Sequence, residues 1–173
     1  MAAAARGDRD AFARLHDRYA PMVHGVLLAR LPRGEVEDLV QDVFLRALRG
    51  VPRLRDGAAF GPWLATIARN CANDRHRRRH TPLGRTEALA DDVPGRVRPD
   101  AEAAEALATI RTLPDAYRET LLLRLVEGMT GPEIAERTGL TPDSVRVNLH
   151  RGMKRLRDLL SDRARGRPET EVR

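Results

Sequence analysis

The sequence predicts an all-α protein of two small helical domains joined by a flexible linker, and three observations lead to this prediction. Apolar residues make up 42% of the 173 residues but aromatic residues only 3%, which suits small cores of Leu, Val, Ile and Ala better than a β-sandwich. Over most of the chain, apolar side chains recur at spacings of three and four. Near residues 80–100 that spacing is lost among Pro, Gly and charged residues, which indicates a linker.

These signals divide the chain into four parts. We expect an N-terminal domain over residues 1–80, a linker over 81–100, a second domain over 101–162 and a frayed tail over 163–173. Each domain lies near the lower size limit for folding alone. The expected helices cover residues 8–30, 35–48 and 58–79 in the first domain, and 101–113, 117–126, 131–138 and 142–160 in the second.

The overall charge points to a polyanionic partner. The net charge is +6, which suggests nucleic acid or an anionic membrane surface. Lys154 is the only lysine, and arginine binds phosphates and guanine edges well, although a GC-rich genome would produce the same bias. The start of the chain lacks a secretory apolar region, and no apolar run approaches the roughly 18 residues of a membrane span. With one cysteine, Cys71, no intramolecular disulfide can form, so we expect a cytoplasmic protein without membrane insertion.

The C-terminal domain contains the clearest motif, a helix-turn-helix between Thr130 and Met153. Gly139 stands where the turn needs an unusual backbone angle, and Thr141 and Pro142 stand at the N-cap and first residue of the second helix. Apolar residues expected to face the core are Ile134, Ala135, Leu140, Val145, Leu149, Met153 and Leu156. This combination predicts a helix placed to enter a major groove of DNA.

The outward face of that second helix is basic. It consists of Arg146, Val147, His150, Arg151 and Lys154, and we call it the recognition face. Arg146 and Arg151 are the best candidates for base or phosphate contacts, and Asn148 lies off its centre. A charged helix face alone would more often be a solvated surface, but the turn chemistry beside it favours DNA recognition.

Six segments, in this order and spacing, carry a resemblance to a known family. They read DAFARLHDRYAPMV, EDLVQDVFLRAL and FGPWLATIARNCANDRHRRR in the first domain, and IRTLPDAYRETLLL, EGMTGPEIAERTGLT and SVRVNLHRGMKRLR in the second. Over residues 10–160 the chain resembles the extracytoplasmic-function (ECF) sigma factors of bacterial RNA polymerase. The resemblance implies an alternative sigma factor that directs the polymerase to specific promoters under the control of an anti-sigma factor. Promoter DNA and core RNA polymerase would be its partners.

The resemblance also assigns roles to two helices of the first domain. The helix over 35–48, with an apolar stripe from Leu39 to Leu48, would dock on a coiled coil of the polymerase's largest subunit. Its polymerase-binding residues would be Asp38, Gln41, Asp42 and Arg46. An acidic face suits a basic partner helix, although the residues alone, without the resemblance, favour an ordinary solvated face.

The helix over 58–79 would read the downstream promoter element. Its DNA-binding residues would be Arg69, Asn70, Asn73, Arg77 and Arg78, because arginines hold phosphates and asparagines pair with base edges. The loop over 54–59 would help to hold a flipped base, whereas the position of Trp63 on the apolar stripe predicts core packing. The helix-turn-helix would bind the upstream element. Its residues Val147 and Asn148 differ from many relatives, which carry a basic residue or a Ser-Arg pair at these positions.

Parts of the sequence are also compatible with two other classes of protein. Glu35, Asp38 and Asp42 could imitate a carboxylate metal site, and Cys71 with two histidines could suggest zinc. Cys71 lies on an apolar stripe and the histidines stand among arginines, so we expect no metal, cofactor or catalytic residues. A helix-turn-helix regulator that does not bind core polymerase remains the alternative, although it would not need a second arginine–asparagine helix.

Overall fold

The computed structural model describes residues 1–79 and 101–165, and in these ranges all regular structure is helical. The main helices are α1 (Ala2–Ala5), α2 (Arg9–Leu28), α3 (Val36–Gly50), α4 (Phe60–Arg79), α5 (Ala101–Arg111), α6 (Asp115–Leu125), α7 (Gly131–Thr138) and α8 (Pro142–Arg165). Short 3-10 turns, η1 (Arg33–Glu35), η2 (Val51–Arg53) and η3 (Gly57–Ala59), join helices of the first domain. The predicted all-α class is thus confirmed, whereas the predicted linker lies outside the described residues. No helix in these ranges is long and apolar enough to cross a membrane.

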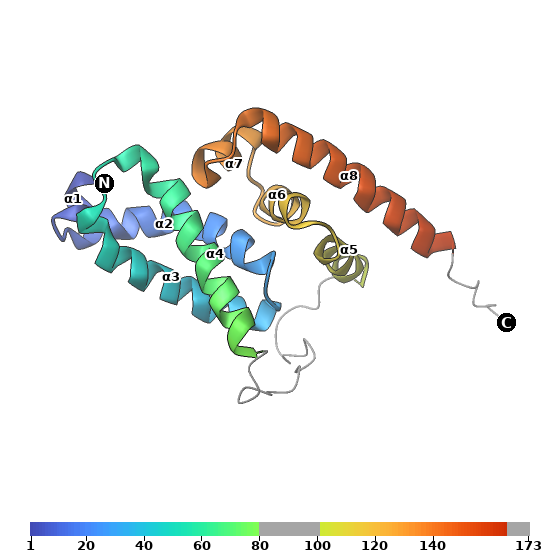
Figure 1. Ribbon diagram of the computed structural model, residues 1–173, viewed down its shortest axis with the longest axis horizontal. Helices are drawn as coiled ribbons and strands as arrows, with labels where there is room; N and C mark the ends of the chain where they lie inside the picture. Colours follow the sequence, from blue (N-terminus) through green and yellow to red (C-terminus); the bar gives the residue numbers. More distant parts are fainter. Residues whose placement is uncertain (80–100, 166–173) are drawn as a thin grey trace.

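Helices α2, α3 and α4 pack together as the first domain (Figure 1). The Asp8 side chain accepts a hydrogen bond from the Ala11 N–H at 2.9 Å and so caps α2. The domain's core is formed by fully buried side chains that include Met22, Val26, Val43, Phe60 and Leu64. The short α1 was not predicted from the sequence, and it packs beside the start of α2.

Helices α5 to α8 form the second domain, in which α6 lies along the long helix α8 (Figure 1). Leu121, Leu122 and Ile134 are fully buried at its centre. Gly152 permits the close approach of α8 to α6, because a Cβ atom there would lie 3.1 Å from Leu121 Cδ1. Helix α8 continues past its predicted end at residue 160 to Arg165, so the expectation of fraying from residue 163 is wrong for 163–165.

The two domains pack directly against each other. Helix α2 lies against α6 and α7, and α4 lies against α7, so both α2 and α4 contact the second domain (Figure 1). Pro21 lies inside α2, where it has no N–H to donate to the carbonyl of Asp17. One residue further along, the Arg18 carbonyl accepts a hydrogen bond from Arg137 of α7 at 3.0 Å.

Candidate nucleic-acid interface

The helix-turn-helix has the turn chemistry predicted from its sequence. A capping box closes the start of α7, in which Thr130 and Glu133 exchange side-chain and backbone hydrogen bonds. Gly139 ends that helix with a φ of 77°, a left-handed conformation that favours glycine. The Thr141 hydroxyl then accepts from the Ser144 N–H at 3.1 Å and caps α8. These contacts set the angle between α7 and α8.

The recognition face of α8 is open to solvent. Arg146, His150, Arg151 and Lys154 are exposed and Val147 is 38% exposed, while Val145 and Leu156 are buried on the opposite side. Arg146 forms an exposed ion pair with Asp143 at 3.1 Å, one turn back along the helix. Such a surface pair is weak, so it leaves the guanidinium available to a phosphate or a base.

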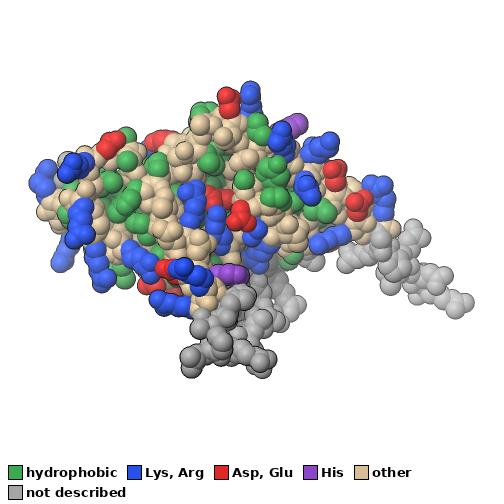
Figure 2. Space-filling model, viewed as in Figure 1, with side chains coloured by type: hydrophobic (Ala, Val, Ile, Leu, Met, Phe, Trp, Pro, Cys, Tyr) green, Lys and Arg blue, Asp and Glu red, His purple; other side chains and the backbone are tan. Residues whose placement is uncertain are grey.

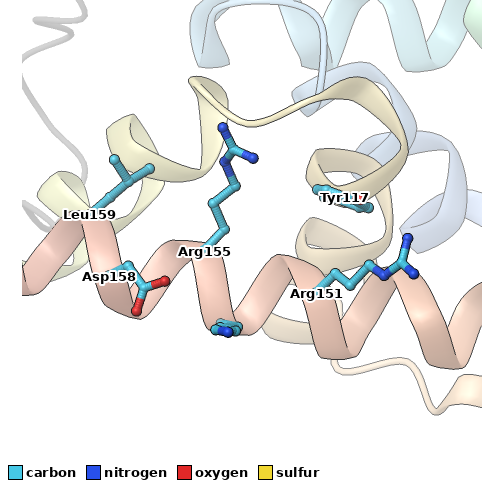
Figure 3. Close-up of a pocket in the computed structure, with 6 residues that line it drawn as sticks. Tyr117, Arg151, Arg155, Asp158 and Leu159 are labelled. Carbon is cyan, nitrogen blue, oxygen red and sulfur yellow. The ribbon is translucent and has the colours of Figure 1, made fainter.

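A groove follows the recognition face along α8 (Figure 3). Its volume is about 420 Å³, and it is lined by Tyr117, Arg151, Lys154, Arg155, Asp158 and Leu159. Arg155 was not among the predicted site residues, although it follows Arg151 by one helical turn, and that spacing was the available signal. The groove therefore extends the basic surface towards α6.

The outer face of α4 carries most of the residues predicted to bind the downstream element. Asn70, Asn73, Arg77 and Arg78 are exposed, and Arg77 forms an ion pair with Asp74. On the inner side Cys71 is buried, and its burial raises the pKa of the thiol. The indole of Trp63 is only half-buried, with its ring centroid 5.9 Å from that of Phe60. The predicted packing of Trp63 in the core is therefore only partial.

Arg69 differs from the other predicted residues of α4. Its side chain is 28% exposed and is paired with Glu119 of α6, which is almost wholly buried. Its guanidinium is therefore engaged between the domains in this arrangement, although the helical spacing would place it on an outward face. No local pattern in the sequence indicates this partner, because the two residues lie 50 positions apart.

The polar face of α3 is also exposed. Asp38, Gln41, Asp42 and Arg46 all face solvent, and Arg46 lies 3.8 Å from Asp74 of α4. Leu45 and Leu48 beside them are 52% and 46% exposed. Leu48 was predicted to belong to the buried apolar stripe, and this is wrong, because its side chain is exposed. The face thus combines acidic and apolar side chains.

Charged side chains are distributed over both domains. Figure 2 shows basic side chains across the whole visible face, with acidic ones beside them at its centre, where the domains meet. Among the described residues, no group of three or more His, Cys, Asp and Glu side chains could hold a metal ion. The exposed faces of α8 and α4 described above carry basic and amide side chains. These define a two-domain helical protein suited to binding DNA.

Similarity to known proteins identifies the family to which this DNA-binding protein belongs. Residues 15–81 match the family Sigma-70 region 2, and residues 103–156 match Sigma-70, region 4. RNA polymerase sigma factor CarQ of Myxococcus xanthus is 36% identical over 163 residues, covering 90% of this chain and 92% of CarQ. ECF RNA polymerase sigma factor SigW of Bacillus subtilis is 30% identical, covering 91% of this chain and 92% of SigW. The chain belongs to the ECF group of RNA polymerase sigma factors.

A solved structure agrees with this assignment. CnrH, in complex with the cytosolic domain of CnrY, is 27% identical and superposes with a TM-score of 0.62, covering 93% of this chain and 94% of that one. Sigma factors are transcription initiation factors that do not themselves catalyse a reaction. The resemblance predicted from six sequence segments is thus confirmed at the level of the family and of the all-α fold.

Proposed function

We propose that this protein is an alternative sigma factor that binds core RNA polymerase and directs it to promoters with two separate DNA-binding faces. The observation that carries the proposal is the pairing, in one chain, of an exposed recognition face on α8 with an exposed arginine–asparagine face on α4. A duplex upstream element would be held by the first of these faces. The second would bind the downstream element as its strands separate.

We assign the roles by domain. Residues 1–80 bind core polymerase and the downstream element, residues 101–162 bind the upstream element, and residues 81–100 connect them. Polymerase contacts are assigned to Asp38, Gln41, Asp42 and Arg46. Downstream contacts are assigned to Arg69, Asn70, Asn73, Arg77 and Arg78. Upstream contacts are assigned to Arg146, Val147, His150, Arg151 and Lys154.

The proposed partners follow from the family. Core RNA polymerase and promoter DNA bind the faces just described, and an anti-sigma factor blocks them when the protein is inactive. The proposal of an anti-sigma factor is supported by the similar structure, in which CnrH is bound to the cytosolic domain of CnrY. The polymerase supplies the catalytic residues, so we assign this chain no enzymatic activity and no cofactor. Its place of action is the cytoplasm, where the polymerase works.

Run-off transcription with core polymerase on a promoter library tests the proposal. We expect promoter-specific initiation only when the protein is added, and its absence would refute the proposal. Arg146→Ala and Arg151→Ala should each weaken upstream-element binding by about 5- to 150-fold, because each removes a base or phosphate contact worth roughly 1–3 kcal/mol. Arg14→Ala, at an exposed position of α2 in the first domain, is the matched control for the loss of one surface arginine.

The polymerase contact needs a separate experiment. Asp42→Arg should weaken binding to core polymerase while leaving upstream-element binding intact, because it reverses a charge on the α3 face. If Asp42→Arg and Arg146→Ala gave the same profile, the division of roles would be wrong. A helix-turn-helix regulator, the alternative function, would fail to bind core polymerase in the absence of DNA.

A further inference from the structure

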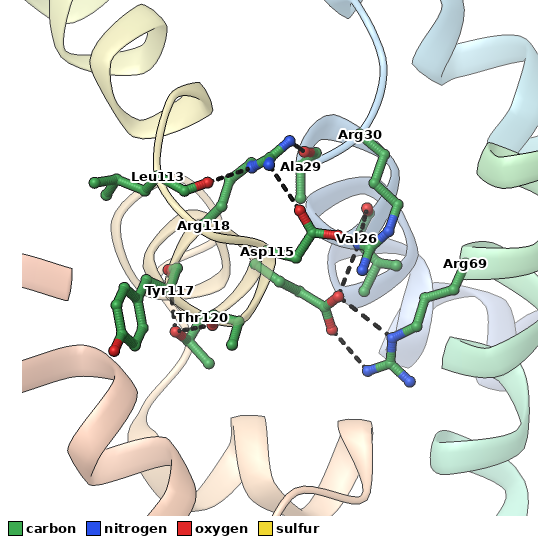
Figure 4. Close-up of polar contacts among 11 residues, drawn as sticks. Val26, Ala29, Arg30, Arg69, Leu113, Asp115, Tyr117, Arg118 and Thr120 are labelled. Carbon is green, nitrogen blue, oxygen red and sulfur yellow. Dashed lines mark hydrogen bonds and ion pairs between the residues drawn. The ribbon is translucent and has the colours of Figure 1, made fainter. Parts of the chain in front are cut away.

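The contact between the domains centres on one buried carboxylate, that of Glu119 in α6. Glu119 is 5% exposed, and two arginines of the first domain, Arg69 of α4 and Arg30 just after α2, bind it (Figure 4). Arg69 of α4 donates from Nη2 to Oε1 at 2.7 Å and from Nε to Oε2 at 3.3 Å. Arg30, which follows α2, places Nη1 2.8 Å from Oε2. Both oxygens of the carboxylate are therefore paired across the domain boundary, a geometry that favours strong, directional bonds.

The charges around this contact are complementary. Arg18 pairs with Glu136 at 3.1 Å, and His24 lies 2.6 Å from Glu127. In these pairs the basic side chain comes from the first domain and the acidic one from the second. Such an arrangement selects one relative orientation of the two surfaces.

Backbone groups are also paired across the boundary. Arg118 of α6 donates to the carbonyl of Ala29 at 2.9 Å (Figure 4). Arg111 of α5 donates to the carbonyl of Leu31 at 3.3 Å. These carbonyls lie at and just beyond the C-terminal end of α2, where intrahelical donors are lacking. The second domain therefore supplies both charge pairs and caps to the first.

Glycines allow the backbones to approach closely at the same boundary. A Cβ atom on Gly61 of α4 would lie 2.9 Å from the carbonyl oxygen of Arg137 in α7. A Cβ atom on Gly25 of α2 would lie 2.7 Å from Cδ2 of Leu123 in α6. The fit of the domains therefore depends on the absence of side chains at these positions.

We propose that this packing of the domains is a self-inhibited state, in which Glu119 keeps Arg69 from binding the downstream promoter strand while the recognition face of α8 stays free. The inference rests on the proposed function, because it takes Arg69 as a downstream contact. On opening, the Arg69 guanidinium exchanges a carboxylate for a DNA phosphate, so its charge stays paired. Glu119 becomes hydrated at the same time, which removes the cost of its burial.

Two variants should open this state by different means. Glu119→Gln removes the charge that binds Arg30 and Arg69 but keeps the shape of the side chain. Gly61→Ala removes no charge and instead places a methyl group against the Arg137 backbone. Gly34→Ala, in the same domain, is the matched control, because a Cβ atom there would meet nothing within 4 Å. Small-angle X-ray scattering of the full chain should show a larger radius of gyration for both variants and no change for the control.

DNA binding then tests the inhibition itself. The probes are a fluorescent single strand with the downstream element and a duplex with the upstream element, both from a promoter selected by run-off transcription. We expect the two variants, without polymerase, to bind the single strand about tenfold more tightly than the unmodified chain. Their affinity for the upstream duplex should not change, since the recognition face is free in both states.

Each alternative outcome refutes a particular statement. If the variants expand the chain but single-strand affinity stays the same, the packing does not inhibit. If neither variant expands the chain, the Glu119 contact and the Gly61 approach do not hold the domains together. Failure of promoter-specific transcription by the unmodified chain would refute the proposed function instead, and the scattering result would still report on the domain packing.

Discussion

Single residues at the start of α7 determine how firmly the helix-turn-helix is held. The Thr130 N–H donates to Glu133 Oε2 at 2.8 Å, and the Thr130 hydroxyl donates to the same oxygen at 2.8 Å. The backbone bond is the main reason why the pKa of Glu133 is lowered, with the hydroxyl bond second. A lowered pKa stabilises the folded state above the ordinary value of 4.5, and this contribution is lost as the pH falls through the folded-state pKa.

Replacing Thr130 with Ala should therefore destabilise the protein. The substitution removes the hydroxyl that accepts from the Glu133 N–H, and loss of such a cap costs about 1 kcal/mol. Chemical denaturation at pH 7 measures the free energy of unfolding. Thr130→Ser retains the hydroxyl and should stay close to the unmodified chain. Equal destabilisation by Ala and Ser would mean that the hydroxyl bonds contribute nothing.

Residue chemistry that acts locally could be predicted from the sequence. Gly139 and Thr141 adopt the turn and cap roles expected of them, because their partners lie within a few positions. Arg69 could not be placed in the same way. Its partner, Glu119, belongs to the other domain, and the sequence around either residue does not show that the two side chains meet.

At the scale of elements, the contact between α6 and α8 positions the recognition face. Gly152 is buried at this contact, with Leu121 and the Tyr117 Cβ atom just above 3 Å from where its own Cβ would be. Gly152→Leu should overpack the contact and lower the free energy of unfolding by about 1–3 kcal/mol. Thermal denaturation followed by circular dichroism measures the loss. Ser161→Leu, at an exposed position of the same helix, controls for the added side chain, and equal effects would contradict the packing argument.

Helix positions followed closely from apolar spacing, whereas some ends and exposed positions did not. Helix α8 extends to Arg165, and Arg163 within this extension donates from Nη1 to the Thr109 hydroxyl of α5 at 2.7 Å. No local spacing of residues in the sequence predicts this bond between two helices. Leu48 shows the opposite error, since its spacing matches the stripe of α3 but its side chain is 46% exposed.

At the scale of the whole molecule, the two-domain class could be predicted but the contact between the domains could not. The α2–α6 and α4–α7 contacts depend on residue pairs such as His24–Glu127, which lie 103 positions apart. Helical periodicity reports which side chains face inward, and it carries no information on which exposed charges meet. Glycines at 25 and 61 were unassigned for the same reason, because close approach becomes visible only once both backbones are placed.

One of these charge pairs makes the domain contact depend on pH. The hydrogen bond to Glu127 is the main cause of a raised pKa at His24; the charges of Glu127 and Glu37 also raise it, while burial and Arg33 lower it. A raised pKa means that the contact is stabilised most below the ordinary value of 6.5, and that this stabilisation is lost as the pH rises through the raised value. The domains should therefore separate more readily at pH 8.5 than at pH 6.

Scattering across this pH range measures the effect. The radius of gyration of the unmodified chain should increase with pH, while that of His24→Gln should vary much less, because glutamine does not titrate. Glu127→Gln is the matched control from the other side of the pair, and it should also reduce the pH dependence because His24 loses its main partner. If the radius of gyration rose equally with pH in all three proteins, the His24–Glu127 pair would not be the cause of the pH dependence. Another titrating group would then be responsible, and it would not be an arginine, because arginines stay charged throughout this range.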